Sequence, residues 1–152
     1  MGSYLEINNR ETNCKTWSGI LIGAIRDIDS RIKSNENSTE KEKKYFVPEY
    51  YKTTDDKGTF GCGDWTINKK GMALVVLYLK DMYEDDEVIR EMAIEDNKHV
   101  LEKIDSPDEL KERIEKYTKE TKDDILWCFN YAVDVLTDML LTGMKRVNAH
   151  WV

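Results

Sequence analysis

Long apolar runs, prolines and paired cysteines are scarce in this 152-residue sequence. The longest apolar run covers residues 72–79, far short of the roughly 20 residues that a membrane-spanning helix needs. The first residues contain no apolar run, which argues against a secretory signal, and Glu6 stands where N-myristoylation requires Ser or Thr. We therefore expect a cytoplasmic protein that makes no membrane contact.

The three cysteines, Cys14, Cys62 and Cys128, include no C-x-x-C pair. This number and spacing argue against both a disulfide framework and a zinc knuckle, so we expect reduced thiols. A chain of this length buries roughly 68–70% of its unfolded surface, which is enough to fold without a metal or a disulfide. Since no linker or internal repeat divides the sequence, we expect a single domain over residues 1–152, with residues 1–3 left over from an expression tag.

Helical periodicity is the clearest pattern in the chain. Apolar residues recur at steps of three and four over residues 12–34, which predicts an amphipathic helix. Asn68 is a suitable cap for a second helix, apolar on nearly all sides, whose pattern continues to residue 104 with a break near residues 84–86. Ser106, followed by Pro107 and Glu109, marks a helix start, and the stripe after it predicts one long helix or two nearly collinear ones up to Gly143.

The remaining segments predict less regular structure. Residues 45–67 are rich in aromatic and β-branched side chains and are interrupted by proline and glycine, so they predict a small irregular β-hairpin. Residues 34–44 carry no apolar side chain and predict a mobile loop, and we expect residues 148–152 to fray or to dock through Trp151. The predicted fold class is therefore mainly α: a single-domain helical bundle of four to five helices with a hairpin insert at about residues 45–67. The length of the helical region 106–147 favours a homo-oligomer, in the simplest case a homodimer.

Acidic residues concentrate in one part of the chain. The net charge is -7, from 23 Lys+Arg against 30 Asp+Glu, and residues 81–96 alone hold eight acidic side chains against Arg90. If this segment is helical, four glutamates share one face, and a row of like charges at that spacing destabilises a helix. We interpret the row as a surface that binds a protein partner with a basic surface, whereas a solvated helix face is the alternative. The candidate partner-binding residues are Glu84, Glu87, Glu91 and Glu95.

Aromatic residues gather in the predicted hairpin, close to lysines. Aromatic faces beside cations can stack a base and hold a phosphate, and tyrosine and tryptophan are also common interface anchors. The alternative is that these side chains pack the hairpin on the helices. The candidate ligand or interface anchors are Tyr45, Phe46, Tyr50, Tyr51, Trp65 and Lys69.

Signatures of catalysis and of metal binding are weak. The sequence has no P-loop, dinucleotide fingerprint, nucleophile elbow or EF-hand. Glu95, Asp96 and His99 have a spacing suited to a metal ion, but the second half of a di-metal site is missing. Cys62 lies between two glycines with no histidine nearby in the sequence. We therefore predict no catalytic residue, metal or cofactor, and an enzyme built on these groups is only a third hypothesis.

The profile that results is that of a small acidic non-enzymatic binding protein. We expect it to act by occupying a macromolecular partner, as immunity proteins, antitoxins and phage anti-defence inhibitors do, which suggests an accessory protein of a virus or mobile element. A protein that binds or sequesters a nucleotide-like small molecule through the aromatic insert is the alternative. Basic residues are too few and too interleaved with acids to favour direct nucleic-acid binding.

Overall fold

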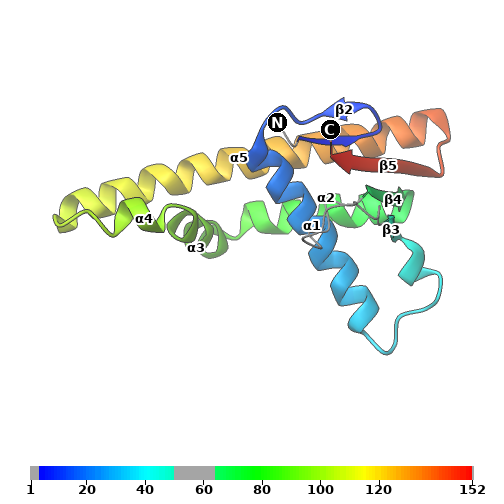
Figure 1. Ribbon diagram of the computed structural model, residues 1–152, viewed down its shortest axis with the longest axis horizontal. Helices are drawn as coiled ribbons and strands as arrows, with labels where there is room; N and C mark the ends of the chain where they lie inside the picture. The colour runs from blue at the N-terminus through cyan, green and yellow to red at the C-terminus, as the bar shows by residue number, and fades with distance from the viewer. Residues whose placement is uncertain (1–3, 50–63, 152) are drawn as a thin grey trace, which may run out of the picture.

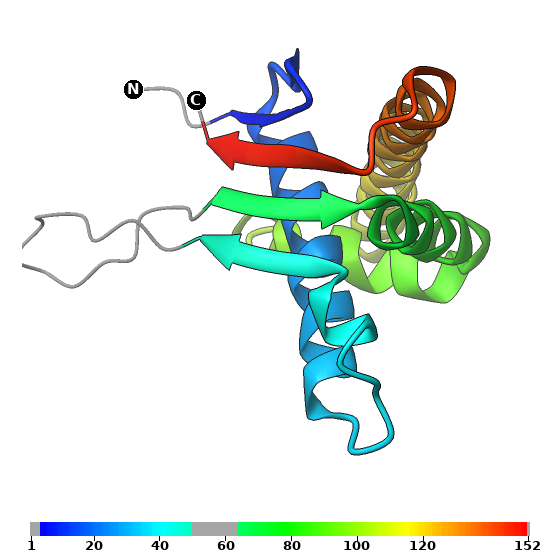
Figure 2. The same cartoon turned by 90° about the vertical axis from the view of Figure 1, so that its right-hand side faces the viewer.

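Both ends of the chain enter one antiparallel β-sheet. The computed structural model describes residues 4–49 and 64–151, and in this part of the chain the strand order is β2-β1-β5-β4-β3. The C-terminal strand β5 therefore lies in the middle of the sheet, between β1 and β4 (Figure 2). The strand bounds are Leu5–Ile7 (β1), Arg10–Glu11 (β2), Phe46–Glu49 (β3), Asp64–Asn68 (β4) and Arg146–Trp151 (β5).

One face of the sheet contributes to the hydrophobic core. Ile7, Ala149 and Trp65 stand opposite one another across β1, β5 and β4, and all three side chains are buried. Successive side chains of a strand point to opposite faces, so the residues between them lie on the other side of the sheet. There, Glu6 and His150 face each other with 3.8 Å between Oε1 and Nε2. The buried face packs against three helices, α1 (Lys15–Ser34), α2 (Lys69–Glu84) and α5 (Pro107–Thr142).

The predicted fold class, a mainly α bundle with a small hairpin, is wrong. Strands β3 and β4 pair where the hairpin is expected, but they belong to a five-stranded sheet. Residues 148–151, expected to fray or dock, are part of β5, and residues 5–11 form β1, β2 and their connection. These strands are too short to be stable alone, and the pairing of Ile7 with Ala149 joins opposite ends of the chain. No local sequence pattern specifies such a pairing.

The connection between β1 and β2 is a two-residue turn fixed to the long helix. Asn8 and Asn9 have φ angles of 52° and 65°, which are typical of the turns that join tightly paired strands and which asparagine tolerates. The Arg10 guanidinium donates to Asp138 Oδ2 through both Nε and Nη2, at 2.9 and 2.8 Å. The hairpin at the N-terminus is thereby held against the C-terminal half of α5.

The main predicted helices are present. Asn68 accepts a hydrogen bond from the Gly71 amide at 2.8 Å, and Ser106 accepts one from the Glu109 amide at 3.4 Å, so both predicted helix starts are confirmed. The apolar stripe that follows Ser106 forms one helix of 36 residues. The helix bounds are Lys15–Ser34 (α1), Lys69–Glu84 (α2), Asp86–Asp96 (α3), Lys98–Leu101 (α4) and Pro107–Thr142 (α5).

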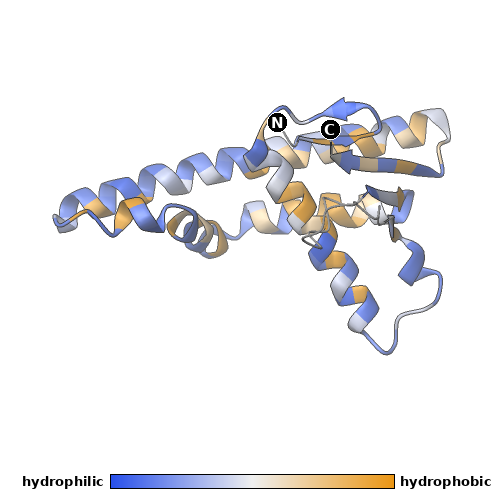
Figure 3. Cartoon of the chain, viewed as in Figure 1, coloured by the Kyte–Doolittle hydropathy of each residue, from blue (hydrophilic) through white to orange (hydrophobic). Residues whose placement is uncertain are grey.

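Helix α5 divides into two halves with different surroundings. Its C-terminal half packs on α1, α2 and the sheet, whereas its N-terminal half extends from the body beside α3 and α4 (Figure 1). We call α3, α4 and residues 107–124 of α5 the arm. Figure 3 shows that the part of α5 within the arm is almost entirely hydrophilic. The arm therefore carries much of the charge of the chain, and the body carries most of the core.

The connection between α1 and β3 is partly ordered. Residues 34–44, predicted as a mobile loop, include a short 3-10 helix at Glu42–Lys44 and a hydrogen bond from the Glu42 amide to Thr39 Oγ1 at 3.1 Å.

Helix α5 is the one helix in the described ranges that is long and apolar enough to cross a membrane, judged by length and composition alone. In its most apolar 18-residue stretch, 33% of the residues are buried. This is weak evidence, because the core helices of soluble proteins have similar compositions.

Candidate functional site

A groove of about 720 Å³ opens where α1 crosses the base of the arm. Figure 1 shows α1 lying across α2 and α5, and the groove is lined by the first half of α1, the second half of α2, the end of α3 and residues 117–124 of α5. Its volume falls within the range of roughly 300–1,000 Å³ that is usual for ligand sites. Four helices that are far apart in the sequence thus converge on one concave surface.

Two glycines of α1 line the groove, one helical turn apart. Apart from the adjoining backbone of α1, a Cβ atom added to Gly19 or Gly23 would meet no heavy atom of the described residues within 4 Å, so no contact that the structure describes requires a glycine at either position. Gly71 of α2 differs, because a Cβ there would lie 2.7 Å from the Tyr45 carbonyl oxygen. Glycine in a helix interior costs about 1 kcal/mol relative to alanine. Helix α1 therefore exposes bare backbone to the groove at some cost in stability.

Asp124 is held at the groove by an aromatic pair. Trp17 Nε1 of α1 donates a hydrogen bond to Asp124 Oδ1 of α5 at 3.0 Å. The Trp17 ring stacks on Trp127 with 3.7 Å between centroids and 9° between planes. The Cys128 thiol donates to the Trp17 carbonyl at 3.5 Å, and burial raises the pKa of Cys128. These contacts fix both α1 against α5 and the carboxylate of Asp124.

The groove has an excess of negative charge. Asp96, Glu120 and Asp124 contribute three carboxylates, and Lys15 contributes one ammonium group. Within residues 4–49 and 64–151, no ion pair involves any of these three carboxylates. Carboxylates that share a concave surface reinforce one another's field and attract cations.

Aromatic and thioether side chains form the less polar part of the lining. Tyr78 and Tyr117 line the groove together with two methionines of α2 and α3. Tyr78 donates its hydroxyl to Asp27 Oδ2 at 2.8 Å, and Arg31 pairs with the same oxygen at 2.9 Å. Burial, and then the hydrogen bond to Asp27, raise the pKa of Tyr78 to about 12. Since its hydroxyl is already engaged, Tyr78 offers the groove a neutral ring.

The acidic row predicted from the sequence is divided between two helices. Helix α2 ends at Glu84, and Asp85 caps α3 by accepting a hydrogen bond from the Val88 amide at 3.2 Å. The prediction that Glu84 shares a helix face with the other three glutamates is therefore wrong, because the break reorients the chain. Glu84 instead forms an ion pair with Lys80, with 3.3 Å between Oε1 and Nζ. The members of the row that remain on α3 are Glu87, Glu91 and Glu95.

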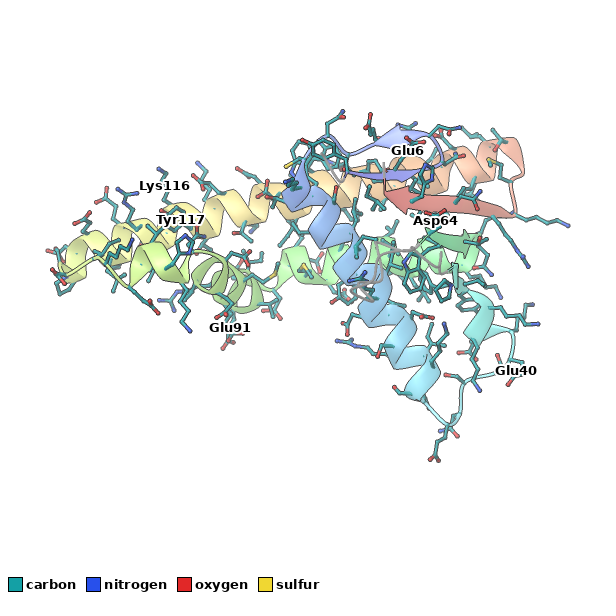
Figure 4. All side chains as sticks on the ribbon, in the orientation of Figure 1. Glu6, Glu40, Asp64, Glu91, Lys116 and Tyr117 are labelled. Carbon is teal, nitrogen blue, oxygen red and sulfur yellow. The ribbon has the colours of Figure 1, made fainter. Side chains whose placement is uncertain are left out.

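These three glutamates form the outer row of the arm. All are exposed, and they recur every four residues on the side of α3 opposite the buried Ile89 and Ala93. Figure 4 shows Glu91 projecting from α3 away from α5. The outer row and the groove therefore place carboxylates on two different sides of the arm.

Two of the six predicted anchors are core residues. Phe46 is 0% exposed and Trp65 is 7% exposed, and both belong to the hydrophobic core, so neither has a free ring face for a ligand. Tyr45 is half-buried against the core, and Lys69 is the partly exposed first residue of α2. Tyr50, Tyr51 and Cys62 lie outside the described residues.

Metal-binding geometry is not found at the spacing noted in the sequence. In the described part of the chain, no group of three or more His, Cys, Asp or Glu side chains could hold a metal ion, and this includes Glu95, Asp96 and His99. The groove was missed by sequence analysis because its residues come from four helices. The pair of glycines inside α1 was the one local signal that pointed to it.

Comparison with known proteins gives no further guide to the site. No protein-family model, curated protein or solved structure gives a significant match to this chain. Function is therefore inferred from the geometry and the charge of the groove and the arm.

Proposed function

We propose that this protein is a non-enzymatic binding protein that acts by occupying a protein partner with a basic surface. The observation that carries the proposal is the groove, where Asp96, Glu120 and Asp124 have no ion-pair partner among the described residues and lie beside aromatic and methionine side chains. A cationic group of a partner would neutralise these carboxylates, and the less polar walls would exclude water from the contact. A nucleotide-like ligand would fit the groove poorly, because its phosphates would meet the same carboxylates, and two of the anchors expected for it in the aromatic insert, Phe46 and Trp65, are buried in the core.

The outer row and the groove have different roles in this proposal. Exposed charges act over a screening length of about 8–10 Å at physiological salt, so Glu87, Glu91 and Glu95 mainly guide the encounter with a basic partner. Charges in a concave site are screened less, so the groove mainly sets how long the complex lasts. Association and dissociation rates should therefore respond to different substitutions.

Occupation of a basic surface suggests inhibition. Enzymes that act on nucleic acids use lysine and arginine to bind phosphates, and a protein that presents carboxylates to those residues blocks the site. The acidic arm extends from the body, its α5 part is mostly hydrophilic, and it is suited to enter such a surface (Figures 1 and 3). The partner class proposed is therefore a nucleic-acid-acting protein, as for an immunity, antitoxin or anti-defence inhibitor.

Self-association through α5 is a second part of the proposal. Leu126 and Leu140 are exposed on α5, and each lies seven residues from Val133, which is partly exposed. A two-fold axis through Val133 in an antiparallel pair would place Leu126 against Leu140 of the second copy. Such a stripe is self-complementary, and exposed apolar side chains are the kind of surface that an interface covers.

The proposed function is tested by capture of partners on the immobilised full chain at about 50 mM and about 500 mM salt. We expect a basic partner at low salt that is lost at high salt, and weaker capture by the variant Asp96→Asn/Glu120→Gln. The control variant Lys43→Gln alters an exposed charge on the body, and it should capture the same partner. A partner that is acidic, or that is retained equally by all variants at high salt, would contradict the proposal.

A further inference from the structure

We infer that the groove receives an arginine side chain carried by a basic segment of the partner, laid over Gly19 and Gly23 of α1. This inference rests on the proposed function and specifies the chemistry of its site. The occupant has to match three properties of the groove: its negative charge, its aromatic walls and its open glycine surface.

Charge complementarity selects a cation. Asp124 is oriented by Trp17, with 3.0 Å between Nε1 and Oδ1, and Glu120 lies one helical turn before it on α5. Asp96 at the end of α3 forms part of the same lining. Carboxylates that converge from two helices can accept hydrogen bonds from several donors of one group, which a planar guanidinium provides.

The walls favour arginine over lysine. Tyr78 and Tyr117 line the groove, and the Tyr78 hydroxyl is occupied by Asp27. A guanidinium stacks on aromatic faces and is more weakly hydrated than an ammonium group. It therefore loses less hydration free energy when it enters a partly enclosed site. The chain already contains such a contact on the same tyrosine, since Arg31 Cζ lies 5.9 Å from the centroid of the Tyr78 ring.

The glycine surface allows the backbone of the segment to approach α1. Beyond the adjoining backbone of α1, no heavy atom in the described part of the chain lies within 4 Å of a Cβ added to Gly19 or Gly23, and both residues line the groove. A free small cation would not require this open surface, whereas a polypeptide would. We therefore assign the occupant to a segment of a protein partner.

The test uses a fluorescent hexa-arginine peptide, with binding measured by anisotropy at about 50 mM salt. In the variant Gly19→Leu/Gly23→Leu the groove is filled while the charge stays the same, and we expect affinity to fall at least about tenfold. Ser30→Leu is the matched control, because it adds a leucine to an exposed position of α1 beyond the groove, and it should bind like the wild type. Leucine favours helix more than glycine does, so the filled variant should melt no lower than the wild type.

Two further double variants each remove two negative charges, one in the groove and the other on the outer row. Glu120→Gln/Asp124→Asn acts in the groove, and the asparagine retains an oxygen for the Trp17 indole. Glu87→Gln/Glu91→Gln acts on the outer row. We expect the groove pair to lose at least about tenfold in affinity and the outer pair only about two- to threefold.

The outcomes separate this inference from the proposed function. If the filled variant binds like the wild type while the outer pair loses binding, the arginine site is wrong and the acidic binding function stands. If hexa-arginine does not bind the wild type at low salt, both are wrong. Equal affinity for a hexa-lysine peptide would overturn the assignment to arginine, and displacement of the peptide by equimolar spermidine would overturn the assignment to a protein segment.

Discussion

The indole rings of Trp17 and Trp127 stack with 3.7 Å between their centroids, and this contact joins α1 to α5 where the groove begins. The same Trp17 donates a hydrogen bond to Asp124. Packing and site geometry are therefore linked, because the residue that holds α1 in place also orients a carboxylate of the groove.

We expect the Trp17–Trp127 pair to show energetic coupling. In a double-mutant cycle with Trp17→Leu and Trp127→Leu, the coupling free energy should be about 1 kcal/mol, as for stacked aromatic pairs. Urea denaturation followed by far-ultraviolet circular dichroism gives the four free energies of unfolding. Leu141→Ala, at a position 80% exposed, is the control and should change stability by less than about 0.5 kcal/mol. Strict additivity of the two tryptophan substitutions would show that the stack contributes nothing.

Replacement by alanine should change the free energy of unfolding in opposite directions at Gly23 and at Gly71. Gly23→Ala should raise the free energy of unfolding by up to about 1 kcal/mol, because alanine favours helix and the added methyl group meets no neighbour. Gly71→Ala should lower it by about 1–3 kcal/mol, because its Cβ would lie 2.7 Å from the Tyr45 oxygen and 2.9 Å from Ile67 Cγ2. Urea denaturation of both variants checks the pair. Destabilisation by Gly23→Ala would mean that the fold itself needs this glycine.

Tyr131 should make stability depend on alkaline pH. Its hydroxyl accepts a hydrogen bond from the Ile7 amide at 3.0 Å and donates one to the Arg10 carbonyl, and burial raises its pKa to about 12. The folded state therefore favours the neutral phenol, so its contribution is complete below the unfolded pKa of about 10 and is lost as pH rises from about 10 to about 12.

The variant Tyr131→Phe isolates this effect. At neutral pH it should be about 1–3 kcal/mol less stable, since two backbone groups lose their partner. The difference in free energy of unfolding between the wild type and the variant should shrink above about pH 10. In that range only the wild type has a phenol at this position whose ionisation favours the unfolded state. Tyr78 titrates in the same range in both proteins and so cancels from the comparison. A difference that is constant up to pH 12 would contradict the assignment.

The helices could be predicted from the sequence, because their signals are local. Asn68 and Ser106 cap helices where the sequence indicates, and the stripe after Ser106 forms a single helix. The sheet could not be predicted in the same way, since β5 pairs with β1 from the opposite end of the chain. The alternation of Leu5, Glu6 and Ile7, followed by two asparagines suited to a tight turn, was the available signal for the N-terminal hairpin.

The candidate site, like the sheet, depends on contacts between distant segments that local sequence patterns do not show. The acidic character of α3 and the helix break near residues 84–86 are both evident from the sequence, and that break, capped by Asp85, separates Glu84 from the other three glutamates. Phe46 and Trp65 resemble binding anchors in the sequence because nothing local shows that the sheet will bury them. The groove arises only when α1 crosses α5, which is a tertiary event.

The apolar stripe on α5 should control the oligomeric state. Light scattering after size exclusion should give a dimer for the wild type and a monomer for Leu140→Glu, which places a charge against Leu126 of the second copy. Leu77→Glu on α2 is the control, because this residue is also exposed, at 53%, but lies outside the stripe. A monomeric wild type, or a dimer that survives Leu140→Glu, would contradict self-association through this face.

Whether the groove at the base of the arm is the binding site can be read from a map of the contact. Amide chemical shifts of the full chain should be followed by NMR during titration with the hexa-arginine peptide. We expect the largest changes on residues that line the groove, namely Gly19, Gly23, Asn97, Glu120 and Asp124. Largest changes confined to residues 45–49 and 64–69, with the groove unaffected, would contradict this expectation.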